Sequence, residues 1–354
     1  MPQKKAALLI GAALAWALAI GGYALAAEAT PANALLATSK GDHTLAIVDP
    51  LSDAVVAKMP IGPDPHEVIA DADGRTAYVS NMGNSSFHRI DVLDLIGQRA
   101  LAPIDTGPLT GVHGLAISSG KLWFTAQGAM AIARLDLASR QVDWIMGTGQ
   151  SWTHMLVLTP DLKRIYATNV MSGSLSIFAL EQARNLPFAP RSRAPRPPAG
   201  VRPPLVWVHT LVATERGAEG VDLSPDGKEV WTASSASGRV YVIDTAARKL
   251  AHVLDAKAIG ANRVKFTHDG RRVLISSLRT GDVLIYDAKA RTEIKRMHVG
   301  RGCAGVLVAP DDRRAYVACT SDNYVAVLDM GTMALVDRID VGPQPDGLAW
   351  ASRH

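Results

Sequence analysis

Three histidines, His66, His113 and His154, occupy matching places in a repeated sequence pattern. Imidazole nitrogens bind Zn, Cu and Fe well, and three of them around one ion leave a coordination position free for water or substrate. Glu219 occupies the same place in a later repeat and could be a fourth ligand, or could accept a hydrogen bond that orients one histidine. We therefore predict that these four residues hold one divalent transition metal, either Zn, Cu or Fe.

The same place is filled in the other repeats by Asn262, Ala304 and Asp346, so that six of the seven aligned residues are polar. Asn262, Asp346 and the neighbouring Arg263 offer hydrogen-bond donors and acceptors, and we predict that they bind a ligand. The alternative interpretation is a solvated channel, in which these side chains hydrogen-bond only to water and to the backbone.

Two glutamates are candidate general bases for a hydrolytic reaction, because a carboxylate of suitable pKa and reach can accept a proton from water. They are Glu67, which directly follows His66, and Glu219. No complete catalytic motif accompanies them: the sequence has no Gly-x-Ser-x-Gly nucleophile elbow, no phosphate-binding loop and no Cys-x-x-Cys-His motif for covalent haem attachment.

The elements that must position these residues are short strands in a repeat of about 42 residues. An apolar strand that ends in aspartate marks the repeats, at Asp49, Asp91, Asp136, Asp244, Asp287 and Asp329. Turn signals such as Pro225-Asp226-Gly227 fall between two apolar runs, as in a β-hairpin. Four short strands at this period are typical of the blades of a β-propeller.

Six repeats are complete, and the two ends of the chain supply a seventh. The complete blades are expected at residues 66–105, 113–147, 154–213, 219–254, 262–298 and 304–340. Residues 34–59 supply three strands without an innermost strand, and residues 346–350 supply an innermost strand with nothing after it. We therefore predict an all-β, seven-bladed β-propeller over residues 33–351, in which the N- and C-terminal strands close one blade and leave no open edge. The aligned polar residues should surround one mouth of its central channel.

The repeats resemble those of the YVTN-repeat β-propellers. The strand motif of that family is matched loosely by Tyr78-Val79-Ser80-Asn81, Tyr166-Ala167-Thr168-Asn169 and Tyr316-Val317-Ala318-Cys319. The resemblance covers nearly all of residues 33–351. It implies a fold shared with lactonase-like propellers, haem d1-domain-like periplasmic propellers, extracytoplasmic binding proteins and surface-layer proteins, and it does not select one function among them.

The N-terminus predicts export. Two lysines precede an apolar run over residues 6–22, which is followed by a small-x-small pattern at residues 24–26. This order is typical of a secretory signal peptide, which we place at residues 1–26. The alternative is a retained N-terminal anchor, because the run is close to spanning length. With the peptide removed we expect no transmembrane span, and a protein that is periplasmic or secreted.

One segment interrupts the repeat pattern. Residues 185–204 are rich in proline and arginine and have no strand or helix periodicity, so we predict a loop inserted within one blade. Its arginines could bind an acidic partner or a membrane surface, and the alternative is a solvated insertion.

The two cysteines lie on consecutive strands. Cys303 begins an innermost strand and Cys319 ends the strand after the following turn. Antiparallel pairing puts Cys303 opposite residue 319 or 320, and export favours oxidation. We predict a disulfide between them; the alternative is two buried thiols.

The absence of a complete catalytic motif favours an exported binding or scaffold protein, with a small molecule or a protein bound at the channel mouth. The alternative is a metal-dependent, lactonase-like hydrolase or lyase built on the three histidines. A weaker hypothesis, implied by the resemblance, is non-covalent haem binding. We expect a monomer and no nucleic-acid partner, because the formal net charge is only +4.

Overall fold

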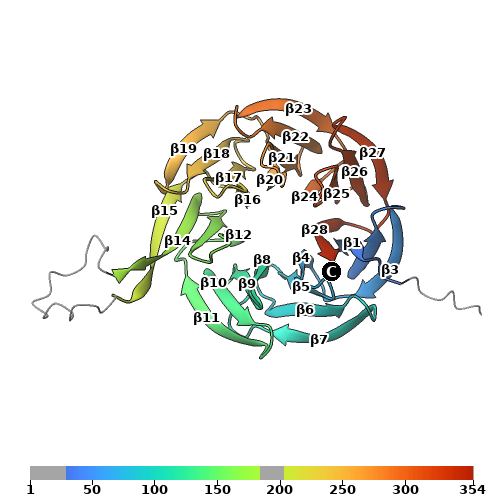
Figure 1. The fold of residues 1–354 in the computed structure, drawn as a ribbon, viewed down its shortest axis with the longest axis horizontal. Helices are drawn as coiled ribbons and strands as arrows, with labels where there is room; N and C mark the ends of the chain where they lie inside the picture. The colour runs from blue at the N-terminus through green and yellow to red at the C-terminus, as the bar shows by residue number, and fades with distance from the viewer. Residues whose placement is uncertain (1–28, 184–202, 354) are drawn as a thin grey trace, which may run out of the picture.

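The computed structural model describes residues 29–183 and 203–353. The predicted signal peptide and nearly all of the predicted loop over residues 185–204 lie outside them. In the described ranges, 28 strands form seven four-stranded antiparallel sheets, which are arranged as blades around one axis (Figure 1). The prediction of a seven-bladed β-propeller is confirmed.

The blades are numbered here along the chain, and their strands are given from the axis outward. Blade 1 contains β28 (Pro345–Ser352), β1 (Asn33–Ser39), β2 (Thr44–Asp49) and β3 (Ala54–Pro60). Blade 2 contains β4 (Pro65–Ala70), β5 (Thr76–Asn81), β6 (Arg89–Asp94) and β7 (Arg99–Asp105). Blade 3 contains β8 (Val112–Ser118), β9 (Lys121–Ala126), β10 (Ala131–Asp136) and β11 (Gln141–Gly147). Blade 4 contains β12 (Thr153–Leu158), β13 (Arg164–Asn169), β14 (Ser174–Gln182) and β15 (Leu205–Ala213).

The remaining blades repeat the same plan. Blade 5 contains β16 (Ala218–Leu223), β17 (Glu229–Ser234), β18 (Val240–Asp244) and β19 (Lys249–Leu254). Blade 6 contains β20 (Ala261–Phe266), β21 (Arg272–Ser277), β22 (Asp282–Asp287) and β23 (Thr292–His298). Blade 7 contains β24 (Cys303–Val308), β25 (Arg314–Cys319), β26 (Tyr324–Asp329) and β27 (Ala334–Ile339).

Blade 1 joins the two ends of the described chain. Strand β1 pairs antiparallel with β28, with Leu35 opposite Trp350 and Leu36 opposite Ala349. In Figure 1 the blue and red ends of the chain accordingly lie side by side in one blade. The closure that the incomplete terminal repeats predicted is therefore present, and it completes the hydrogen bonding of β1 on its inner side.

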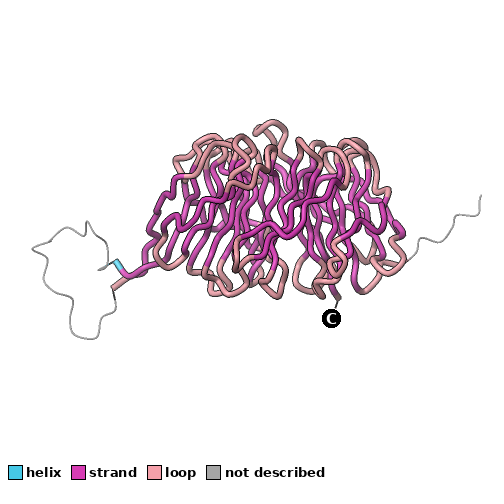
Figure 2. The backbone as a smooth tube through the Cα atoms, turned by 90° about the horizontal axis from the view of Figure 1, so that it is seen from above, coloured by secondary structure: helices cyan, strands magenta, loops and turns pink. Residues whose placement is uncertain are grey.

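The core lies between the blades. The second strand of each blade is buried along almost its whole length, and it carries the largest buried side chains, such as Trp123, Tyr166, Trp231 and Tyr316. The outermost strands are mostly exposed. Strands run through the thickness of the ring with loops on both faces (Figure 2). Among the described residues no helix has the length and hydropathy needed to cross a membrane.

Candidate functional site

The seven aligned residues meet at one cavity. We call His66, His113, His154, Glu219, Asn262, Ala304 and Asp346 the ring column; each is the second residue of the innermost strand of its blade. All seven line a cavity of about 180 Å³, which we call the ring cavity; it is also lined by Lys40, Arg263, Leu278 and Thr320. The structure therefore brings together every residue of the predicted metal site and the predicted ligand-binding residues.

A β-bulge aims each ring-column side chain. In all seven innermost strands the pairing register shifts near the start of the strand, for example between Pro65 and Val68 and between Ala218 and Val221. The ring-column residue lies inside this irregularity. Bulges bend a strand and redirect side chains, so the repeated bulge explains why one position in every blade points into the channel mouth.

Glycine follows the ring column in four blades, at Gly114, Gly220, Gly305 and Gly347. A Cβ atom on Gly347 would lie 2.1 Å from the backbone oxygen of His66, and one on Gly305 would lie 2.0 Å from that of Asp346. The absence of a side chain therefore lets the ring-column backbone of the next blade come close. The tight backbone packing expected from these glycines is present.

Hydroxyl groups near the ends of the second strands tie neighbouring blades together. Thr125 Oγ1 accepts from the backbone nitrogen of Gly114 at 2.9 Å and donates to the carbonyl of His154 in the next blade at 2.5 Å. Thr168 likewise donates to the carbonyl of Glu219 at 2.7 Å. Because these side chains bridge one ring-column segment to the next, the spacing of the ring column is held by the framework itself.

The contacts of His66 and His113 limit where their protons can lie. Lys40 Nζ lies 3.2 Å from His66 Nδ1 and Asp346 Oδ2 lies 3.3 Å from the same nitrogen, so a neutral His66 would accept from Lys40 there and a protonated His66 would donate to Asp346. In both states His66 Nε2 carries a proton and donates to Asp64 Oδ1 at 3.2 Å. His113 Nε2 lies 3.2 Å from His66 Nδ1, and when it donates there the lone pair of a neutral His113 is on Nδ1. That atom is buried and has no hydrogen-bond partner.

His154 is fixed in the same way. Its Nδ1 lies 2.8 Å from Gln127 Oε1, an amide oxygen that can only accept, so Nδ1 carries the proton and Nε2 the lone pair. Gln127 Nε2 donates to Ser85 Oγ at 2.8 Å, which holds the amide in this orientation. The rings of His113 and His154 stack with centroids 3.7 Å apart. Burial, reinforced by neighbouring positive groups, lowers the pKa of both histidines well below the usual value, so both are neutral at pH 7.

Two carboxylates close this part of the network. Asp346 is 4% exposed and pairs with Lys40 Nζ at 2.5 Å. Burial raises the pKa of Asp346, but the charges of Lys40, His66 and Arg263 outweigh burial and hold the pKa below its usual value. The hydrogen bond from His66 is the main cause that lowers the pKa of Asp64 to about 2. Both carboxylates are therefore ionised at neutral pH.

An ion pair crosses the channel beneath the ring column. Arg263 on β20 donates through Nη2 to Glu67 Oε1 on β4, and the two side chains are only 8% and 13% exposed. These strands lie on opposite sides of the axis (Figure 1). We call Glu67 and Arg263 the cross-channel pair. The pair comes one residue after the ring column in each strand, and its Arg263 lines the ring cavity.

The cross-channel pair distinguishes the two candidate bases. The carboxylate of Glu67 is engaged by Arg263, and Glu67 does not line the ring cavity. Glu219 does line it, and burial raises the pKa of Glu219 above its usual value. Arg263 Nη1 also donates to Asn262 Oδ1 at 2.9 Å, and Asn262 Nδ2 donates to Glu219 Oε2 at 2.6 Å. Of the two glutamates, Glu219 is therefore the one placed to act on a bound molecule.

The three histidines contact one another in this conformation. His66 and His113 are hydrogen-bonded, and His113 and His154 are stacked. Within residues 29–183 and 203–353, no group of three His, Cys, Asp or Glu side chains is arranged to hold a metal ion. Coordination of one ion by the predicted ligands would require the rings to turn, and the metal stays a prediction.

The cysteines lie directly behind the ring cavity. Cys303 is opposite Cys319 across β24 and β25, which is the pairing that the sequence predicted. Both are buried free thiols with their sulfur atoms 3.3 Å apart. The disulfide stays a prediction. A disulfide between Cys303 and Cys319 would form next to the ring cavity, because Ala304 and Thr320, which follow the two cysteines, line that cavity.

Sequence reasoning missed Lys40 and Gln127. Both directly follow the second strand of their blades, and the residues at this place are Lys40, Met82, Gln127, Val170, Ser235, Leu278 and Thr320. Three of the seven line the ring cavity, and Gln127 orients His154. The repeat alignment that revealed the ring column contains this second column as well. It shows no shared residue type, which is why its polar members did not stand out.

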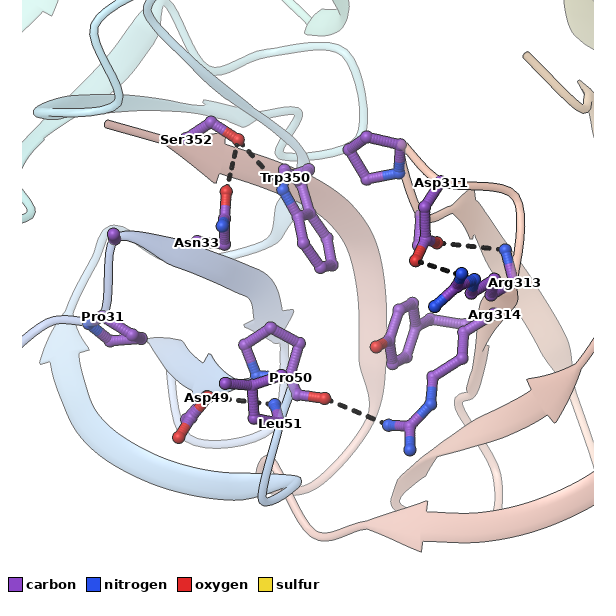
Figure 3. A pocket seen from close by; sticks show the side chains of 14 residues that line it. Pro31, Asn33, Asp49, Pro50, Leu51, Asp311, Arg313, Arg314, Trp350 and Ser352 are labelled. Carbon is purple, nitrogen blue, oxygen red and sulfur yellow. Dashed lines mark hydrogen bonds and ion pairs between the residues drawn. The ribbon is translucent and has the colours of Figure 1, made fainter. Parts of the chain in front are cut away.

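A larger cavity of about 540 Å³ lies between blades 7 and 1, toward the ends of the innermost strands that are far from the ring column (Figure 3). Trp350 projects into it, and its polar groups pair with each other: Arg314 Nη1 donates to the carbonyl of Pro50 at 3.0 Å, and Ser352 Oγ donates to Asn33 Oδ1 at 2.8 Å. The segments of blades 5 and 6 that are equivalent in the repeat to those lining this cavity form a groove of their own. This cavity is therefore a product of the repeat, whereas the ring cavity combines residues from all seven blades.

Comparison with known proteins supports the fold. The family model described as the cytochrome D1 heme domain matches residues 208–305. A comparison with curated proteins found no match. Among solved structures, Kuenenia stuttgartiensis hydrazine synthase is similar with a TM-score of 0.63 at 18% identity, over 81% of this chain and 89% of that chain.

Two further structures share the fold over nearly their whole length. A putative 6-phosphogluconolactonase from Bacteroides uniformis has a TM-score of 0.67 at 16% identity, over 90% of this chain and 99% of that chain. A functionally unknown protein from Desulfotomaculum acetoxidans has a TM-score of 0.71 at 9% identity, over 91% of this chain and 100% of that chain. At such low sequence identities, the structural similarity establishes the fold and does not establish an activity. The resemblance to lactonase-like and d1-like propellers is confirmed at that level.

Proposed function

We propose that this protein is an exported, periplasmic binding propeller whose ring cavity holds a small cation. The observation that carries the proposal is His113 Nδ1, a ring nitrogen that is buried in the wall of this cavity without a hydrogen-bond partner. An imidazole lone pair binds either a metal ion or a hydrogen-bond donor. His154 Nε2 offers a second lone pair, because its other nitrogen donates to Gln127.

The charges around the cavity support a positively charged ligand. The two cationic side chains are already engaged, Lys40 by Asp346 and Arg263 by Glu67. When all four are ionised, the carboxylates of Asp64, Glu67, Glu219 and Asp346 outnumber these two cations even with a protonated His66 added to them. A small cation would therefore enter an electrostatically favourable site, with space limited to about 180 Å³.

Two kinds of ligand share this chemistry, a divalent transition metal and a small protonated amine. Imidazole nitrogen suits Zn, Cu and Fe, and one metal ion shared by His66 and His113 would require the contact between His113 Nε2 and His66 Nδ1 to break. An ammonium group can donate to the two lone pairs without that change. The metal remains the ligand that the residue types favour, and the amine is the ligand that the present ring orientations favour.

Isothermal titration calorimetry tests the proposal. The mature protein, purified from a periplasmic fraction without a tag or chelator, is titrated with Zn, Cu and Fe salts and with methylammonium chloride. We expect one site, with affinity reduced at least about tenfold in the His113→Ala/His154→Ala variant. The matched control is His88→Ala, because the side chain of His88 is 56% exposed and pairs only with Asp105 on the surface. The proposal would be refuted if the wild type bound none of these ions, or if the His113→Ala/His154→Ala variant bound them as tightly as the His88→Ala control.

The same preparation tests export. Edman sequencing of the periplasmic protein should begin after residue 26 if the predicted signal peptide is removed. A chain that starts at residue 1 and sediments with membranes would favour the retained anchor instead.

Haem does not fit the ring cavity. Pockets for drug-sized ligands occupy about 300–1,000 Å³, and the ring cavity, at about 180 Å³, is smaller. The partial match to the cytochrome D1 heme domain model therefore gives no haem site at this position. Titration with haem should leave the ring-cavity affinity for small cations unchanged.

A second candidate function is a metal-dependent hydrolase or lyase. It is favoured by Glu219, whose raised pKa and place in the ring cavity suit a general base. Similarity to a putative 6-phosphogluconolactonase makes simple lactones the first substrates to test. Turnover that is lost in Glu219→Gln but kept in Glu67→Gln would support it, and no turnover with Zn, Cu or Fe added would count against it.

A further inference from the structure

Beneath the cross-channel pair, the wall of the channel changes from polar to apolar. A cavity of about 470 Å³ lies there, which we call the lower cavity. Its apolar lining comes from the innermost strands of blades 2 to 5: Ile69, Leu115, Ala116, Ile117, Leu156, Val157, Leu158 and Leu223. These residues come two to four places after the ring column in the same strands. At a rise of about 3.3 Å per residue, the lower cavity therefore begins roughly 7 Å below the ring column.

The two cavities are separate. They share no lining residue. On β4 and β20 the cross-channel pair lies between them, because Glu67 falls between His66 and Ile69, and Arg263 falls between Asn262 and Lys265. The lower cavity is therefore lined by parts of the innermost strands that lie farther from the ring-column mouth.

The lower cavity exposes apolar side chains that the fold does not cover. Ile117, Val157, Leu158 and Leu223 are only half-buried, although they belong to the innermost strands. Leaving such surface in contact with water is unfavourable, and a molecule that displaces the water is stabilised in proportion to the apolar area it covers. The volume lies within the usual range of about 300–1,000 Å³ for pockets that hold a small molecule.

The polar groups at the open end are already satisfied. Lys265 Nζ lies 3.6 Å from Asp222 Oδ1, and Asp222 Oδ2 accepts from the backbone nitrogen of Phe266 at 2.8 Å. The hydroxyls of Thr159 and Ser224 donate to aspartates in their own turns. No charge here is left without a partner, so the lining offers little to a charged ligand.

We propose that the lower cavity is a second binding site, which takes a compact, uncharged apolar molecule. It is distinct from the cation site in the ring cavity, because the two cavities share no lining residue. The protein then presents two chemically different sites on the two faces of one channel.

Fluorescence titration tests this with N-phenylnaphthylamine, an uncharged apolar dye whose emission rises in apolar surroundings. We expect saturable binding at one site per chain. Ile117→Arg places a charge in the cavity wall, and it should weaken the dye affinity on the order of tenfold or more. Leu223→Gln is a milder change in another blade. If circular dichroism shows that Ile117→Arg is not folded, the dye affinity of Leu223→Gln is the test of the proposal.

Two controls make the result specific. Ile145→Arg adds the same charge to an outer strand, where the isoleucine is 54% exposed, and it should leave dye binding unchanged. The His113→Ala/His154→Ala variant should also bind the dye normally, even if it has lost the cation. The proposal is overturned if the wild type shows no saturable binding, or if folded lower-cavity variants bind the dye as the wild type does. It stands or falls separately from the proposed cation site.

Discussion

Burial of two neutral histidines should make this fold sensitive to mild acid. His113 is 1% exposed and His154 is 8% exposed, and in the folded protein the pKa of each lies well below the ordinary value of 6.5. In the unfolded chain both would titrate near that ordinary value. Below about pH 6.5 the unfolded state therefore binds more protons than the folded state, so the free energy of unfolding falls as the pH falls.

The size of the effect follows from this difference in proton binding. From pH 7 to pH 5.5, a histidine with an unfolded pKa of 6.5 that stays neutral when folded loses about 1.3 kcal/mol of stabilising free energy. The two histidines together should account for about 2.5 kcal/mol. Other groups titrate in the same range, so the prediction concerns the difference between the wild type and a variant that lacks both imidazoles.

Urea unfolding, followed by tryptophan fluorescence at a series of pH values, measures this difference. His113→Gln/His154→Gln keeps a hydrogen-bond donor at each position and removes the titration. The variant should be less stable than the wild type at pH 7, and its disadvantage should shrink by about 2.5 kcal/mol by pH 5.5. A stability difference that is the same at both pH values would show that the two histidines take up protons in the folded state as they do in the unfolded state, and it would refute their burial as neutral groups.

Three further changes test the framework of the site. Gly347→Ala should destabilise the protein by about 1–3 kcal/mol, because its Cβ would meet the backbone of the next blade, whereas Gly147→Ala, which has nothing within 4 Å, should be close to neutral in the same urea titration. Arg263→Met should cost about 3–5 kcal/mol by leaving the Glu67 carboxylate buried without a partner, and adding Glu67→Leu should recover much of that loss; failure of the second change to help would mean that the pair is not coupled. Thiol counting on denatured, unreduced periplasmic protein should find no free cysteine if the predicted disulfide forms, and two free thiols per chain would exclude it.

The sequence alone determined the fold and the ring column. An internal repeat places equivalent residues at equivalent positions around a ring, so aligned polar residues in the innermost strands had to meet near one mouth. The incomplete first and last repeats likewise required each other, because each lacks the strands that the other supplies. Both conclusions rest on strand periodicity, which is a local property of the chain.

Tertiary structure decided the chemistry of the site. Glu67 and Arg263 are 196 residues apart, and only closure of the seven-bladed ring brings their strands to opposite sides of one narrow channel. That contact engages the carboxylate of Glu67, which does not line the ring cavity. The proton positions on His66, His113 and His154 depend on Lys40, Asp64 and Gln127, which come from loops or strand ends outside the innermost strands. Side-chain contacts across the axis follow from how the blades pack together, and no local pattern in the sequence records them.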